Sequence, residues 1–154
     1  MITVRSYKDS VRKQVLESIK RIAIAQAQSA GVPADRMPEV KMEGDYTPST
    51  YNNPELTARV MAAVGKSLGE MRVYERDPSM GGEDFSQFGR TPEKIPTVAM
   101  WVGGVDPAKF RAGADGTGPI QPGNHSPLFA PVPEPTLKTG VQAMTAAALE
   151  LLGK

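Results

Sequence analysis

The sequence GPIQPGNHSPLFAPVPEP at residues 118–135 limits how the second half of this chain can fold. Proline removes a backbone donor and fixes φ, and glycine adds conformational freedom, so neither a helix nor a central strand can pass through such a run. We therefore expect a loop whose path is largely preset. This loop contains His125, the only histidine among the 154 residues.

The residues next to His125 in the sequence do not decide its chemical role. Ser126 follows it, and the apolar pair Leu128 and Phe129 comes next. Imidazole is a common metal ligand and acid–base group. A single histidine with no nearby cysteine or histidine is nevertheless a weak ligand signal. On these residues alone, His125 is either a ligand or acid–base group, or an ordinary loop residue.

Composition describes a globular chain of one domain or two small pieces. The 40% hydrophobic and 23% charged fractions are ordinary, and a net charge of +1 gives no electrostatic reason to expect nucleic acid or an anionic membrane as a partner. The absence of cysteine excludes disulfides and thiolate metal sites. No apolar run approaches the ~20 residues that span a bilayer, and the first residues lack the form of a signal peptide. The compartment stays unknown.

Residues 2–46 are expected to form a β–α–β unit. Ile2–Tyr7 and Glu39–Tyr46 alternate apolar and polar residues as strands do. Between them, apolar residues recur at helical spacing over Val11–Ala30, and Asp9 or Ser10 can cap that helix. Such a unit buries too little surface to be a comfortable independent domain. It therefore looks like half of a larger one.

Past the polar linker Thr47–Asn53, helices and strands alternate. A helix is expected over 54–68, because Asn53 can cap it and Pro54 and Glu55 are favoured in its first turn. A second helix is expected over Thr136–Leu152. Met71–Glu75 and Ile95–Val102 are predicted strands. The order favours an α/β sandwich, although its sheet would be thin. The apolar stripes of the two helices are Leu56, Val60, Val64 and Leu68, and Leu137, Val141, Met144, Ala148 and Leu151.

The turn Gly81-Gly82-Glu83-Asp84 is the second place where chemistry could occur. Glycines allow close approach of the backbone to a ligand, and a helix starting at Glu83 would direct free N–H groups at an anion. The two acids could also bind a metal or act as a general base. The alternative is a tight turn followed by acids that cap a helix. A phosphate loop is excluded, because the lysine and hydroxyl residue that it needs are absent.

Several of these segments together resemble one family. ITVRSY with its following helix, YTPSTYNNPEL, PSMGGEDFSQF, NHSPLF and a closing alanine- and leucine-rich helix are similar in order and spacing to the carboxy-terminal part of the metal-dependent M20 amidohydrolases and peptidases. The likeness is to the hippurate-hydrolase, aminoacylase and carboxypeptidase-like enzymes. It runs from residue 2 to the final helix. GGEDF and NHSPLF are its most specific parts.

The resemblance implies a domain organisation. Residues 1–50 would be the second half of a lid and dimerisation domain, a ferredoxin-like half, and residues 51–154 the carboxy-terminal portion of an α/β sandwich catalytic domain. Such enzymes hydrolyse the amide bond of N-acyl amino acids or small peptides. Zinc, manganese or similar divalent ions activate a water molecule there, and a glutamate is the general base. A homodimer through the lid unit is also implied.

Individual site residues follow from the same resemblance. His125 matches the last metal ligand, the histidine of an H-x-P-x-F motif, while Gly81, Gly82, Glu83 and Asp84 match the loop that borders the metals and the substrate. The remaining ligands and the general base have no match here. A catalytic zinc site typically needs three protein ligands. The chain by itself is therefore expected to be inactive, as a truncated reading frame, a proteolytic remnant or a partial protein.

Two other functions remain open from the sequence. A non-catalytic module could fold alone and pair through an exposed strand edge. It would be well packed, whereas a partial domain would expose apolar faces on the helices at 54–68 and 136–152. A single-ion binding protein centred on His125 would need Glu83 or Asp84 within bonding distance of the imidazole.

Overall fold

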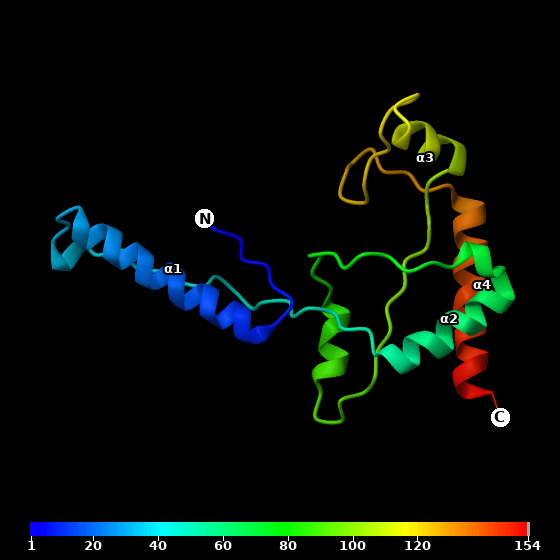
Figure 1. The fold of residues 1–154 in the computed structure, drawn as a ribbon, viewed down its shortest axis with the longest axis horizontal. Helices are drawn as coiled ribbons and strands as arrows, with labels where there is room; N and C mark the ends of the chain where they lie inside the picture. The colour runs from blue at the N-terminus through cyan, green and yellow to red at the C-terminus, as the bar shows by residue number, and fades with distance from the viewer. Residues whose placement is uncertain (154) are drawn as a thin grey trace. The chain divides into compact units, whose positions relative to one another are not determined.

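The computed structural model describes residues 1–153, which form two compact units (Figure 1). The first unit contains Met1–Asn52 and Asp77–Thr97, and the second contains Asn53–Arg76 and Val98–Lys154. The division after Asn52 falls at the polar linker, while 77–97 belongs with the amino-terminal residues. The α-helices are α1 (Asp9–Ser29), α2 (Pro54–Leu68), α3 (Pro107–Ala114) and α4 (Pro133–Leu152), and the 3-10 helices are η1 (Ala34–Arg36), η2 (Glu70–Arg72) and η3 (Asp84–Arg90).

Helix α1 begins two residues earlier than the apolar pattern predicts. Lys8 occupies the N-cap position and makes no side-chain cap, so the prediction of a cap by Asp9 or Ser10 is wrong. Asp9 instead lies in the first turn, where its charge suits the positive end of the helix dipole. At the other end, Gly31 has φ 72° and Val32 donates to the carbonyl of Ala27, which is a Schellman termination.

Helix α2 begins where its sequence signature predicts. The Asn53 side chain accepts a hydrogen bond from the N–H of Leu56 at 2.9 Å, and Pro54 lies in the first turn, where its missing N–H costs nothing. Gly69 ends the helix with φ 97°, a conformation that favours glycine.

The four predicted strands are absent from residues 1–153. The segments 2–7, 39–46 and 95–102 have no regular secondary structure, and Met71 lies in η2. An alternating pattern describes a backbone that can pair, but a strand exists only when a neighbouring strand supplies its hydrogen bonds. The β–α–β unit and the α/β sandwich therefore stay predictions.

The apolar core of the second unit lies between α2 and α4, which cross and pack against each other (Figure 1). Val60 and Val64 of α2 meet Ala143 and Ala147 of α4, and all four are buried. Small alanines allow the helices to approach closely. The partly buried residues around this core are Leu56, Met61, Leu68, Val73, Val98, Met100 and Ala146.

The large apolar stripe of α4 faces outward instead of lying on a sheet. Leu137 and Val141 are each 67% exposed and Met144 is 63% exposed, whereas the alanines on a different face meet α2. Apolar spacing identifies a helix with a buried face only if that face has a partner. The expectation of an exposed apolar face thus holds for α4, while the α2 stripe is covered by α4.

Candidate functional site

His125 lies in a double turn inside the proline-rich loop. The Ser126 N–H donates to the carbonyl of Gly123 at 2.9 Å, and the Phe129 N–H donates to the carbonyl of Ser126 at 3.0 Å. The Ser126 hydroxyl accepts from the N–H of Leu128 at 3.2 Å, a local bond typical of serine in turns. The backbone at His125 is therefore constrained, and its side chain is exposed.

The loop that carries His125 is closed at its base. The Val132 N–H donates to the carbonyl of Gly104 at 2.8 Å, and the Thr136 hydroxyl donates to the carbonyl of Gly103 at 3.3 Å. A Cβ at Gly104 would lie 3.1 Å from the Cβ of Pro131, so glycine permits this approach. Helix α4 starts at Pro133, three residues earlier than predicted and inside the run 118–135 that was expected to be a loop, because proline is tolerated in a first turn.

The acidic glycine turn is built mainly as a helix start. The Glu83 side chain accepts from the Phe85 N–H at 3.5 Å and occupies the N-cap position of η3. The Asp84 Oδ1 accepts from the Thr47 hydroxyl at 3.4 Å. Neither Gly81 nor Gly82 is among the glycines with positive φ, so the backbone itself does not require glycine there. These contacts match the capping alternative, and both acidic side chains remain exposed.

Arg5 fastens the segment just ahead of this turn. Its Nη1 donates to the carbonyl of Met80 at 2.6 Å. The bond joins the first residues of the chain to 77–97, within the first unit. Arg5 therefore acts here as a structural residue.

The side chains present do not make up a metal centre. No group of three or more histidine, cysteine, aspartate or glutamate residues in 1–153 is arranged to hold an ion. His125 belongs to the second unit, and the turn Gly81–Asp84 belongs to the first. A catalytic zinc site needs three protein ligands, and a two-ion site needs more. The described residues thus do not fit a divalent ion on their own.

A shallow, open depression lies on the surface between α2 and α4, a feature that the sequence did not suggest. Lys66 and Ser67 line one side, and Gln142 and Thr145 line the other. The Gln142 Nε2 donates to the Ser67 carbonyl at 2.7 Å and to its hydroxyl at 3.1 Å. This bond satisfies a carbonyl of the last turn of α2, so it stabilises the helix end.

The comparisons with known proteins agree on one family of peptidases. The model of peptidase family M20/M25/M40 matches residues 10–150. Thermostable carboxypeptidase 1 and thermostable carboxypeptidase 2 of Saccharolobus solfataricus are each 32% identical to the chain over 152 residues. The match covers 99% of this chain and 34% of each relative, so the chain spans about a third of their length. No solved structure gave a significant match.

No helix within the described part of the chain has the length and apolar character needed to cross a bilayer.

The match to the family model extends from α1 through α4 and includes the turn at 81–84 and the loop at His125. The chain belongs to peptidase family M20/M25/M40.

Proposed function

We propose that this chain supplies the carboxy-terminal part of an enzyme that hydrolyses the amide bond of N-acyl amino acids or small peptides. The observation that carries the proposal is the family match over residues 10–150, which includes both GGEDF and NHSPLF. Relatives named carboxypeptidases, each 32% identical, support hydrolysis of peptide substrates. The acyl group and the amino acid are left open.

In this proposal His125 contributes one ligand to a centre of zinc, manganese or similar divalent ions. The turn Gly81–Asp84 borders the substrate. The other ligands and the general base come from polypeptide beyond the residues described here. The bound ions would activate the attacking water when the centre is complete. Since the described residues do not form that centre, the 154-residue chain alone is inactive in this proposal.

The outward stripe of α4 supports a partial domain over a stand-alone binding module. A self-sufficient module would bury Leu137, Val141 and Met144, because contiguous exposed apolar patches are uncommon on monomers. We also propose a homodimer formed through the first unit, as the family resemblance implies. The compartment is left open.

The DNA sequence just upstream of the Met1 codon tests the proposal. The expected result is an in-frame upstream sequence that encodes a His-x-Asp or Cys-x-His ligand motif. The longer product should hydrolyse N-acyl amino acids when supplied with zinc or manganese. His125→Ala in that product should lower kcat/KM more than about 100-fold, since even outer-shell changes at metal sites cost 10–100-fold. Asn124→Ala, an exposed neighbour in the same turn, is the matched control.

Two results would overturn the proposal. One is a clean start site at Met1 with no ligand motif in frame ahead of it. The other is a longer, metal-dependent product in which His125→Ala and Asn124→Ala have the same activity.

A further inference from the structure

The first unit is held together by polar contacts more than by an apolar core. Its buried residues are Pro48 and Ser86, whereas all the buried valines and alanines of the described chain lie in the second unit. The apolar burial that normally stabilises a fold is therefore small here. Two stretches far apart in sequence, 1–52 and 77–97, nevertheless form one compact body.

Side-chain hydrogen bonds connect these two stretches at several places. Arg5 bonds the carbonyl of Met80, and Thr97 donates to the carbonyl of Tyr51 at 3.2 Å. Arg90 and Asp9 form a salt bridge, in which the Arg90 Nη2 lies 2.6 Å from the Asp9 Oδ2. A short bond between ionised groups is the strongest type in this set.

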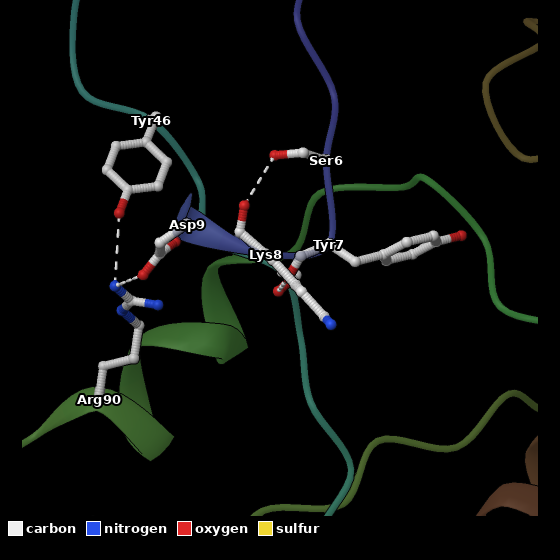
Figure 2. Close-up of polar contacts among 7 residues, drawn as sticks. Ser6, Tyr7, Lys8, Asp9, Tyr46 and Arg90 are labelled. Atoms are coloured by element: carbon white, nitrogen blue, oxygen red, sulfur yellow. Dashed lines mark hydrogen bonds and ion pairs between the residues drawn. The ribbon is translucent and has the colours of Figure 1, made fainter. Parts of the chain in front are cut away.

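Figure 2 shows how Arg90, at the end of η3, meets Asp9 and Tyr46. The same Nη2 donates to the Tyr46 hydroxyl at 3.4 Å. Tyr46 is held in turn by Arg12, whose guanidinium lies 3.6 Å from the centre of the ring. The bond to the Asp9 carboxylate raises the pKa of Arg90 above its ordinary value, so the guanidinium stays charged.

We propose that Asp9, Tyr46 and Arg90 form an electrostatic latch that fastens segment 77–97 to the start of α1. Opening the latch frees the part of this segment around Arg90, while Arg5 and Thr47 still hold the residues at the turn Gly81–Asp84 and α1 remains folded. Both side chains of the ion pair are about half exposed, at 42% and 56%, so dissolved salt can screen them. The Debye length falls from about 10 Å at 0.1 M salt to about 3 Å at 1 M. The latch does not depend on the chemistry proposed above.

Hydrogen exchange measured by mass spectrometry on the full chain tests the latch. Arg90→Gln should speed exchange of peptides from 84–97 by about two- to fivefold, the range expected from an exposed pair. Asp9→Asn should have the same effect, and the double variant should exchange no faster than either single one. Tyr46→Phe, which removes only the hydroxyl, should have a smaller effect. Salt at 1 M should speed exchange in the wild type and leave Arg90→Gln nearly unchanged.

Lys138→Gln is the matched control, because it removes an ion pair with the same 2.6 Å separation in the second unit. It should leave exchange at 84–97 unchanged. Exchange of α1 peptides reports separately whether the helix stays folded in each variant. The latch is overturned if both single variants exchange like the wild type at 84–97, if their effects add in the double variant, or if α1 and 84–97 open together.

Discussion

At the scale of single residues, Asn53 fixes where α2 begins. Its side-chain oxygen accepts the N–H of Leu56, one of the donors that a helix start leaves without a partner. The sequence Asn53-Pro54-Glu55 predicts this start, because a capping side chain, a proline and an acidic residue are each favoured at the beginning of a helix. Asp106-Pro107 has the same signature, and the Asp106 carboxylate caps α3 through Ala108 and Lys109. The same local signal therefore predicts α3, a helix within a stretch that was expected to be a loop.

Replacing Asn53 with alanine should destabilise the second unit by about 1 kcal/mol, the usual value of an N-cap. Asn53→Asp keeps an acceptor at the same position and should be nearly neutral. Urea unfolding followed by circular dichroism measures both. If Asn53→Ala unfolds at the wild-type urea concentration, the cap has no energetic role.

The second residue-scale prediction concerns Glu93. A hydrogen bond from its own backbone N–H lowers the pKa of this carboxyl below its ordinary value. A depressed pKa in the folded state means that the contribution to stability is present above the unfolded pKa and is lost as pH falls through the folded one. Carbon-detected NMR titration should give a lower midpoint for Glu93 in the chain than in a peptide of residues 91–95. Equal midpoints would contradict the bond.

At the scale of elements, α4 shows what a hydrophobic pattern leaves undecided. The spacing of Leu137, Val141 and Met144 identifies a helix, but it does not say which neighbour covers that stripe. In the structure α4 packs on α2 through Ala143 and Ala147, since α2 is the partner present. The same reasoning applies to the predicted strands, whose alternation could not supply the paired backbone that a sheet requires.

Two matched substitutions test this arrangement of faces. Val60 is 0% exposed, so Val60→Ala should cost about 2 kcal/mol through lost burial and a residual cavity. Val141→Ala makes the same chemical change on an exposed surface and should cost less than about 0.5 kcal/mol. Urea unfolding at low protein concentration gives both values. A large cost for Val141→Ala would show that the stripe is covered in solution.

At the scale of the whole molecule, the sequence predicts local features and leaves the long-range ones open. The linker before Asn53, the preset loop around His125 and the start and end of α2 follow from local backbone chemistry. The grouping of 77–97 with the amino-terminal stretch depends on Arg5, Asp9, Arg90 and Thr97, whose partners lie 46 to 81 residues away. No local pattern encodes such pairings. The candidate site could be predicted only as separate pieces, because its turn and its histidine belong to different units.

In the proposed function, His125 is one ligand of a hydrolytic centre whose other ligands lie outside this chain. The most direct test incubates the purified 154-residue chain with zinc or manganese and an N-acyl amino acid, and measures release of the free amino acid. We predict no turnover above a blank that contains the metal alone. Turnover above that blank, abolished by His125→Ala, would show that these residues form a working centre and would contradict the claim.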